Sequence, residues 1–509
     1  MEIAENVENA EDVQACARAV APVPGPVAPR RRSPAVRRAL VAAVAGCAVL
    51  GGVLVLLPGG AERPAALPGP AGRAVIAAAA GAPAALPDLA ALIGEQEARV
   101  RARPRDGLAW AALGAAYVER GSRTARTTDY PRAERALRGS LAVRPGGNVE
   151  ALDGLAALAA ARGDWRGARQ WGEAAVRVAP KRWSSYVALV DAYRGVGDYK
   201  AADRTLEKLT GLSSGAGTSV TLRTAAVYGD RGWREDAAAV LADATARAGT
   251  PAERAALSQR GGDLAWERGE PADALRHQDA ALAADPAAHG ALAGRARALA
   301  SLGRTAEAVT AYRAALARRP EPGYALELGE LYQSLGDERA AGAQYAALRA
   351  RVAAQRADGV DDALVLGRFE ADHGDPEAAV ARLRAEWSRA PGIAVADALG
   401  WAYHRAGDDD AARWFLRRAT DRQKGGTVRN ARYSFHLGAV ERESGLYGAA
   451  RRHLGEALRI NPGFSPLYGP EARAALTALG SPPEGGVPQM WPPKPAAVPA
   501  RAQTPPKRR

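Results

Sequence analysis

The stretch LGAVERESGLYGAARRHLGEALRINP, residues 437–462, contains two apolar patterns separated by a glycine. Leu437 belongs to the first pattern, and Ala450 and Leu454 belong to the second. Small and large apolar residues three or four positions apart line one face of a helix. Gly445 lies between the patterns, where glycine readily takes the left-handed backbone conformation of a tight turn. The stretch therefore predicts a helix, a turn and a second helix that packs on the first.

The same arrangement recurs along the chain, and its turn glycines are 33 to 42 residues apart. The ten glycines are Gly121, Gly163, Gly197, Gly232, Gly269, Gly303, Gly336, Gly374, Gly407 and Gly445. A period of this length is typical of a helical-repeat solenoid, in which each unit buries its apolar face only against its neighbours. We therefore expect an all-α array of about ten helix-turn-helix units. Such arrays usually bind other molecules and rarely catalyse.

The order of residue types inside each unit resembles the tetratricopeptide repeat. That order is Leu-Gly, Tyr, Gly-Asp, a small residue, an aromatic residue or Leu, another small residue and Pro. The seventh unit shows the beginning of the pattern, with Leu328, Gly329, Tyr332, Gly336 and Asp337. The resemblance implies a right-handed superhelical solenoid of about ten such repeats. An irregular helical bundle is the alternative fold.

Aspartates that follow turn glycines are predicted to begin the second helix of their unit as N-caps, because a carboxylate can accept bonds from the free N–H groups there. They are Asp198, Asp337, Asp375 and Asp408. The first unit fits the pattern if about seven residues are inserted in the turn at Gly121. Small residues such as Gly114 and Gly329 are expected to let the paired helices approach closely.

Residues 39–57, ALVAAVAGCAVLGGVLVLL, contain no charged or strongly polar side chain. As a helix, these 19 residues span about 28 Å, close to the roughly 30 Å hydrocarbon core of a bilayer. Five arginines precede this segment within residues 30–38. Because the basic flank stays in the cytoplasm, the sequence predicts a single-pass transmembrane helix with the N-terminus inside and the repeat array outside the cytoplasm.

Two other interpretations of this segment stay open. Gly59, Gly60 and Ala61 form a passable signal-peptidase site, and cleavage there would release the protein. Residues 44–47, Val-Ala-Gly-Cys, also resemble a bacterial lipoprotein box, although apolar sequence continues for ten residues beyond Cys47.

Composition adds three expectations. Only six of the 69 basic residues are Lys, a bias typical of a high-GC bacterial genome. The net charge of +13 is spread over 509 residues, and the array is expected outside the cytoplasm, so we do not expect a nucleic-acid partner. The two cysteines, Cys16 and Cys47, both precede the array, which therefore cannot contain a disulfide.

The sequence divides into seven predicted segments. A Pro-rich tail is expected to end the chain, with nine prolines and Trp491, and its composition favours the polyproline II conformation. Asp88 is the predicted N-cap of a capping helix that starts the ordered region. The segments are a disordered cytoplasmic tail (1–38), the transmembrane helix (39–57), a Pro/Ala/Gly-rich linker (58–87), an N-terminal capping helix (88–106), the repeat array (107–462), a C-terminal capping helix (463–480) and a disordered basic tail (481–509).

No pattern of residues indicates catalysis, a cofactor or a metal. The six histidines include no pair at the one-turn spacing of a helical metal site. No phosphate-binding loop, nucleophile elbow or dinucleotide fingerprint is present. Residues 408–410, three consecutive aspartates, lack the Gly and the distal Glu of a calcium loop, and a helix-start cap is the favoured interpretation.

Helical-repeat proteins bind partners in a concave groove, and the resemblance implies which positions of each first helix line it. The early positions are Asp153, Asp191, Arg194, Asp263 and Trp266. The later positions, which we expect to form the main peptide-binding surface within residues 360–445, are Arg368, Trp401, His404, Arg405, Arg432, Phe435 and Arg442. Aromatic residues beside arginines are typical of binding hot spots and of sites for carboxylates. The alternative is that Trp401 and Phe435 only fill the seam between repeats.

Two classes of function follow from these expectations. The first is a membrane-tethered scaffold that binds a protein or peptide partner in the groove of an extracytoplasmic array, where the arginines favour an acidic partner. The second is an accessory or chaperone-like subunit of a membrane enzyme complex, because residues 89–114 also resemble the entry to the repeats of the membrane-anchored subunit of cytochrome c maturation machinery. Neither class is an enzyme.

Overall fold

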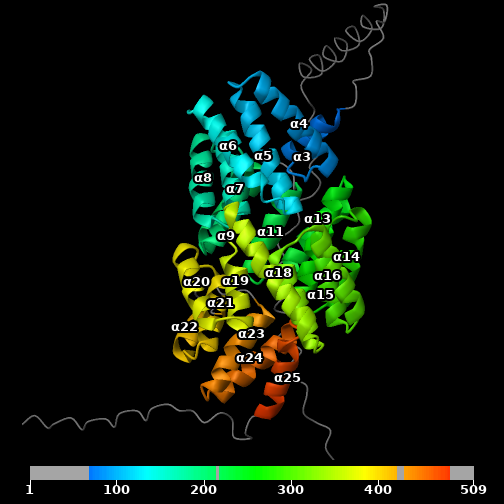
Figure 1. The fold of residues 1–509 in the computed structure, drawn as a ribbon, viewed down its shortest axis with the longest axis vertical. Helices are drawn as coiled ribbons and strands as arrows, with labels where there is room; N and C mark the ends of the chain where they lie inside the picture. The colour runs from blue at the N-terminus through cyan, green and yellow to red at the C-terminus, as the bar shows by residue number, and fades with distance from the viewer. Residues whose placement is uncertain (1–67, 214–216, 421–428, 482–509) are drawn as a thin grey trace, which may run out of the picture. The chain divides into compact units, whose positions relative to one another are not determined.

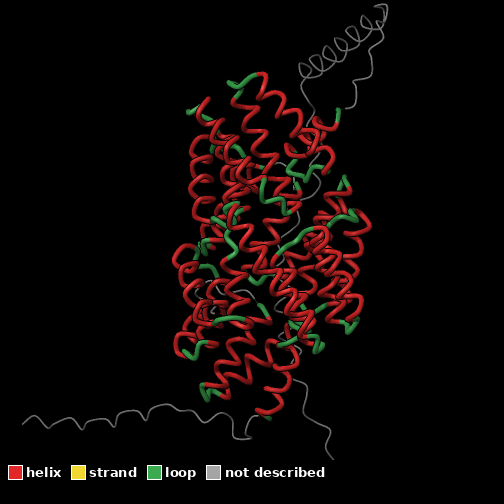
Figure 2. Tube along the Cα trace, in the orientation of Figure 1, coloured by secondary structure: helices red, strands yellow, loops and turns green. Residues whose placement is uncertain are grey.

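The computed structural model describes residues 68–213, 217–420 and 429–481. These ranges contain helices and no strand (Figures 1 and 2). The helices are α3 (Pro70–Ala79), α4 (Leu86–Ala102), α5 (Gly107–Thr124), α6 (Asp129–Val143), α7 (Val149–Ala161), α8 (Trp165–Val178), α9 (Ser184–Gly195), α10 (Tyr199–Leu212), α11 (Thr218–Asp230), α12 (Arg234–Arg247), α13 (Pro251–Glu267), α14 (Pro271–Ala284), α15 (His289–Ser301), α16 (Thr305–Arg318), α17 (Pro322–Ser334), α18 (Glu338–Ala357), α19 (Ala363–His373), α20 (Pro376–Arg389), α21 (Ile393–Arg405), α22 (Asp409–Thr420), α23 (Ala431–Glu443), α24 (Tyr447–Ile460) and α25 (Tyr468–Leu479).

Ten consecutive helix pairs make up the array, from α5–α6 to α23–α24. The two helices of each pair pack on each other, and each second helix also packs on the first helix of the next pair. First helices of neighbouring pairs touch as well, for example α5 with α7 and α21 with α23. The prediction of an all-α array of about ten tetratricopeptide-like repeats is confirmed within the described ranges.

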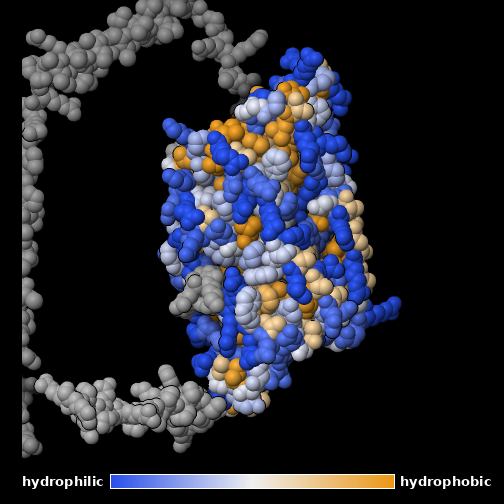
Figure 3. All heavy atoms as spheres, turned by 90° about the vertical axis from the view of Figure 1, so that its left-hand side faces the viewer, coloured by the Kyte–Doolittle hydropathy of each residue, from blue (hydrophilic) through white to orange (hydrophobic). Residues whose placement is uncertain are grey.

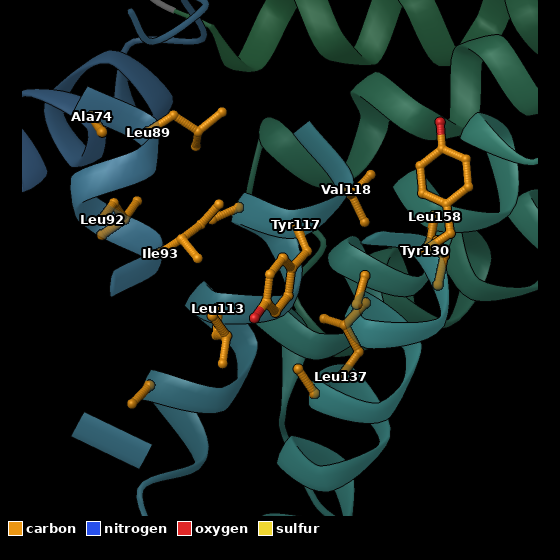
Figure 4. Close-up of a cluster of buried hydrophobic side chains, with 14 of the residues drawn as sticks. Ala74, Leu89, Leu92, Ile93, Leu113, Tyr117, Val118, Tyr130, Leu137 and Leu158 are labelled. Carbon is orange, nitrogen blue, oxygen red and sulfur yellow. The ribbon is translucent and has the colours of Figure 1, made fainter. Parts of the chain in front are cut away.

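Figure 4 shows how the start of the array is packed. Ile93 of α4 points toward Tyr117 of α5, and Leu89 and the fully buried Leu137 of α6 belong to the same buried cluster. A β-carbon on Gly114 would lie 2.5 Å from Cγ of Leu137, so no larger residue fits between α5 and α6 without displacing that leucine. Glycine at this position thus sets the distance between the paired helices.

All four predicted aspartate N-caps are confirmed. The carboxylate of Asp198 accepts a bond from the third residue of α10, with 2.9 Å between Oδ1 and the backbone nitrogen of Ala201. Asp337, Asp375 and Asp408 cap α18, α20 and α22 in the same way. In the acidic run that begins with Asp408, the next two carboxylates pair with His404 and Arg413. The favoured interpretation of this run, a helix start, is therefore correct.

Eight of the ten turn glycines have a positive φ angle, and Gly121 and Gly374 do not. Gly121 lies inside α5, which continues to Thr124, and Ala125 takes the left-handed conformation with φ of 52°. The prediction of a turn at Gly121 is wrong because the first unit accommodates its extra residues mostly as added helix. The glycine is needed there for a different reason, since a β-carbon would lie 2.7 Å from Cε1 of Tyr130.

The helical region begins earlier than predicted. Helix α3 lies within residues 58–87, which the sequence assigns to an extended linker, and it packs on α4. Asp88 is not an N-cap, because α4 begins at Leu86 and Asp88 stands in its first turn. Its carboxylate instead accepts two bonds from Arg73 of α3, at 2.9 and 2.6 Å. This ion pair and the burial of Ala74 hold an alanine-rich segment as a helix that lacks strong sequence signals of its own.

Several predicted segments lie outside the described residues. They are the cytoplasmic tail (1–38), the transmembrane helix (39–57), the first part of the linker (58–67) and nearly all of the basic tail (482–509). None of the helices in the described ranges is both long and apolar enough to cross a membrane.

Contacts between distant repeats are the main feature that the sequence did not predict. The backbone N–H of Asp361 donates to the carbonyl of Arg162, at 2.7 Å, and the N–H of Ile393 donates to the hydroxyl of Tyr199, at 3.0 Å. Arg319 likewise donates to the carbonyl of Ser122. In each case residues at or beside the junction between the two helices of one repeat meet the loop that follows the repeat five units later. The same relation holds in the fifth repeat, where Asn461 Nδ2 donates to the carbonyl of Trp266, at 2.7 Å.

Two turn glycines allow a test of these contacts. Gly197 and Gly336 have nearly equal φ angles, 76° and 77°, but a β-carbon at 197 would lie 2.5 Å from the carbonyl oxygen of Pro391, whereas at 336 it meets open space. Gly336→Ala should cost about 1–2 kcal/mol of stability from backbone strain alone. Gly197→Ala should cost roughly 1–3 kcal/mol more, because it also pushes the third repeat away from the loop before α21. Urea unfolding of both variants measures the difference, and equal losses would contradict the contact.

We also expect the stability of the protein to depend on pH, because of a carboxyl group in the loop before α19. Burial, followed by the negative charges of Glu321 and Asp361, raises the pKa of Asp362 to about 6, and its Oδ2 is buried without a hydrogen-bond partner. A carboxyl group whose pKa is raised in the folded state stabilises the protein at low pH, and this contribution is lost as the pH rises toward the folded pKa. Between pH 4 and pH 7, the wild type should therefore lose roughly 1–3 kcal/mol relative to Asp362→Asn, as measured by urea unfolding of both proteins. A constant difference would show that the carboxyl is solvated.

Candidate functional site

A cavity of about 630 Å³ lies among the first helices of the later repeats and the segment that leads into α25. Helices α13, α15, α17, α19 and α23 contribute to its wall, together with residues 461–466. Its polar lining residues are Glu267, Arg297, Ser301, Thr305, Tyr312, Glu327, Glu330, Ser334, Arg368, Asn430, Arg432, Tyr433, Asn461, Ser465 and Arg473. Residues of the fifth to eighth repeats and of the tenth repeat thus meet around one space.

The segment 461–466 forms part of the wall because two hydrogen bonds fix it to the fifth and sixth repeats. Asn461 Nδ2 donates to the carbonyl of Trp266, and the hydroxyl of Ser301 donates to the carbonyl of Gly463, at 3.0 Å. A β-carbon on Gly463 would lie 2.8 Å from the side chain of Ser301. The close approach therefore requires glycine, and it brings the end of the array against its middle.

One arginine of the cavity wall is fully paired with carboxylates of the protein itself. Nε of Arg297 donates to Glu327, at 3.0 Å, and Nη1 donates to Asp263, at 3.2 Å. The hydroxyl of Tyr312 donates to the same oxygen of Glu327, at 2.9 Å. Burial opposes the charge of Arg297, but the two carboxylates outweigh it and raise its pKa well above the ordinary value. This arginine is committed to the protein's own acids and is not free to bind a ligand.

Two other arginines of the cavity wall have unused donors. Arg368 and Arg432 line the cavity, and neither side chain makes a hydrogen bond or ion pair with another described residue. Nε of Arg368 is buried without a partner. Burial disfavours the charged form of Arg432, yet the negative charges of Glu330 and Asp397 outweigh it and raise its pKa. Two charged guanidinium groups therefore offer hydrogen bonds to an anionic group that enters the cavity.

The structure places the predicted aromatic contacts elsewhere. Trp401 is only 4% exposed, its Nε1 donates to Asp372 at 2.8 Å, and its ring stacks on His436 with 4.2 Å between centroids. Phe435 is completely buried and stacks on Tyr468, at 5.0 Å. Both rings fill the seam between the last repeats and α25, as the alternative interpretation held. Their assignment to the groove surface is therefore corrected, because the rings are needed to join consecutive repeats.

The remaining predicted residues divide into two groups. Of the seven later positions, only Arg368 and Arg432 line the cavity. His404, Arg405 and Arg442 do not, and they contact Asp409, the carbonyl of Ala371 and Glu443 respectively. Of the early positions, Trp266 lines the cavity and Asp263 supports it through Arg297, while Asp153, Asp191 and Arg194 pair with Arg182, Arg223 and Asp230.

Some cavity residues were missed although the sequence contained a signal for them. Arg297 and Glu330 stand six positions before their turn glycines, the same offset as Arg368. Carrying this offset through every unit would have found both residues. Asn461 and Arg473 had no such signal, because they reach the cavity only through the contact between the end of the array and the fifth repeat.

Comparison with known proteins agrees with the repeat pattern. Residues 289–322 match the model of the tetratricopeptide repeat, and this range covers α15 and α16. No curated protein matches the sequence. Solved structures with a similar fold include the Cut9–Hcn1 hetero-tetramer of the APC/C, at 15% identity over 80% of this chain and 94% of that chain with a TM-score of 0.30.

Two further solved structures are similar to parts of this chain. One is a tetratricopeptide repeat protein from Parabacteroides merdae, at 16% identity over 52% of this chain and 100% of that chain with a TM-score of 0.31. The other is a human IFIT1 dimer with PPP-AAAA, at 14% identity over 72% of this chain and 94% of that chain with a TM-score of 0.37. The sixth helix pair thus matches the tetratricopeptide repeat, and it is one of the ten consecutive helix pairs of the described array.

Proposed function

We propose that this protein is a membrane-tethered interaction scaffold that binds an acidic segment of a partner protein in the cavity of an extracytoplasmic tetratricopeptide array. The observation that carries the proposal is the pair of arginines, Arg368 and Arg432, whose donors are unused inside a cavity of about 630 Å³. Ligand pockets commonly measure about 300–1,000 Å³, so this space suits a short peptide segment.

Charge favours an acidic ligand over a basic or neutral one. Arg297 is neutralised by Glu327 and Asp263. Among the described residues, no carboxylate forms a hydrogen bond or ion pair with Arg368 or Arg432, although the charge of Glu330, which also lines the cavity, acts on Arg432. A carboxylate of the ligand would accept bonds from both guanidinium groups and would regain the hydrogen bonds that they lose on burial. Trp266 and Phe464 supply apolar wall for the rest of the segment.

The tether and the orientation rest on the sequence of residues 39–57 and on the arginines before it. The right-handed superhelix that the tetratricopeptide resemblance implies belongs to the same proposal. In this arrangement the apolar segment anchors the protein, and the array presents its cavity to partners outside the cytoplasm.

Binding can be tested with a fluorescein-labelled octapeptide of alternating Asp and Glu and the purified full-length protein in detergent micelles. The double variant Arg368→Gln, Arg432→Gln should weaken binding by at least about tenfold, because two charge-assisted hydrogen bonds are lost. Arg405→Gln is the matched control, since Arg405 is an arginine of the same array that does not line the cavity. Fluorescence anisotropy measures both. Equal affinity for the wild type and the double variant would show that the cavity is not the site.

The orientation has a separate test. A reporter enzyme that is active only outside the cytoplasm, fused after Leu479, should be active in the membrane fraction of bacterial cells. Activity in the soluble periplasmic or culture fraction would indicate cleavage of the anchor. A second reporter, active only in the cytoplasm, is fused at the same position in a separate experiment. If this second reporter is active and the first is not, the proposed orientation is reversed.

A further inference from the structure

A second surface lies on the outer helices of the eighth and ninth repeats. Trp387 of α20 and Phe415 of α22 meet edge to face with 5.4 Å between centroids, and Trp414 packs edge-on against Phe415 at 4.6 Å. The guanidinium of Arg418 lies over both indole rings, 5.3 Å from Trp387 and 5.8 Å from Trp414. We call these four residues the aromatic patch, and none of them lines the cavity.

The patch is unusual for an outer face. Trp414 is 56% exposed, the highest exposure of any tryptophan among the described large hydrophobic residues. Figure 3 views the side on which α20 and α22 lie in Figure 1, and hydrophobic residues there form small groups between charged ones. A single exposed apolar residue needs no explanation. Here, Trp414 and the partly buried Trp387 both contact Phe415, and an arginine lies over both indoles, so the exposed ring is held in a preorganised surface.

The chain itself contains a segment whose chemistry suits this surface. Residues 482–509 lie outside the described residues, and within them Trp491-Pro492-Pro493-Lys494-Pro495 is the densest cluster of proline and aromatic residues. Proline-rich segments favour polyproline II, which docks on exposed aromatic rings at a low entropic cost because its conformation is already formed. The pyrrolidine rings would pack on the indoles of the patch.

The segment leaves the array at a point from which it can reach the aromatic patch. Arg451 of α24 donates to the carbonyls of Leu479 and Gly480, at 2.5 and 2.8 Å, and so fixes the chain end against the first half of α24. Arg451 stands six residues after its turn glycine, and Trp414 stands seven after Gly407, so the two lie at similar heights on their helices. Both α22 and α24 pack on α23. Packed helices are about 8–10 Å apart, and the twelve residues from Gly480 to Pro492 can extend about 37 Å.

We propose that residues 488–496 dock on the aromatic patch of the same chain. Attachment through a short linker gives an effective concentration in the millimolar range, so even a weak contact between prolines and indoles is populated. The docked segment would shield the exposed face of Trp414. This proposal does not depend on the ligand of the cavity.

Photo-crosslinking tests the docking in the full-length protein in detergent micelles. Ala496→p-benzoylphenylalanine places the reactive group beside the proline cluster and keeps Trp491. Irradiation should crosslink this position to α20 or α22 within one chain, as identified by mass spectrometry of the digested monomer. Trp414→Ala should reduce the yield of these crosslinks by about tenfold, as expected for the loss of one aromatic contact.

The matched control is Trp233→Ala. Trp233 is also largely exposed, at 45%, and also carries an arginine over its ring, but it lies at the start of α12. This variant should leave the crosslinks unchanged, and circular dichroism should show the same helix content for all three proteins. Crosslinks to other elements, an equal yield in Trp414→Ala, no crosslink at all, or a product of twice the chain mass would each overturn docking within one chain.

Discussion

The contact between one repeat and the loop that follows the repeat five units later fixes how distant repeats lie relative to one another. Each contact uses at least one backbone group, such as the carbonyl of Arg162 or the N–H of Asp361. At Gly163, Gly197 and Gly269, the turn also comes so close to the distant loop that a β-carbon has little or no room. Without this constraint, the curvature of the array, and so the spacing between the first helices of distant repeats, would not be fixed. With it, residues from the fifth and tenth repeats become neighbours, and the cavity forms between them.

The helical fold could be read from the sequence because its determinants are local. A turn glycine, an aspartate cap and a small residue opposite a leucine or tyrosine each act within about forty residues, and the pattern repeats often enough to be recognised. The errors arose where a local signal was missing or ambiguous. Gly121 serves a close packing contact instead of a turn, and α3 is held by its ion pair with Asp88 instead of by its own composition.

The candidate site was harder to predict for a physical reason. A fixed offset from the turn glycine selects residues of each first helix, and one of them, Arg368, lines the cavity. It cannot distinguish a residue that faces the cavity from one that packs between repeats. At the same offset, Trp401 is buried because α25 covers the last repeats and needs a large side chain beneath it. Only the position of the capping helix separates these two roles.

An array in which each repeat touched only its neighbours would extend under load like a spring and could lose its end repeats one at a time. The hydrogen bonds between distant repeats connect parts of the array that would otherwise be free to move apart. The hydroxyl of Tyr199, for example, accepts a bond from a residue 194 positions further along the chain. Pulling on the two ends of the described array must therefore break these bonds before the helices separate. A protein built in this way would transmit force between the two ends of the described array with little elastic extension.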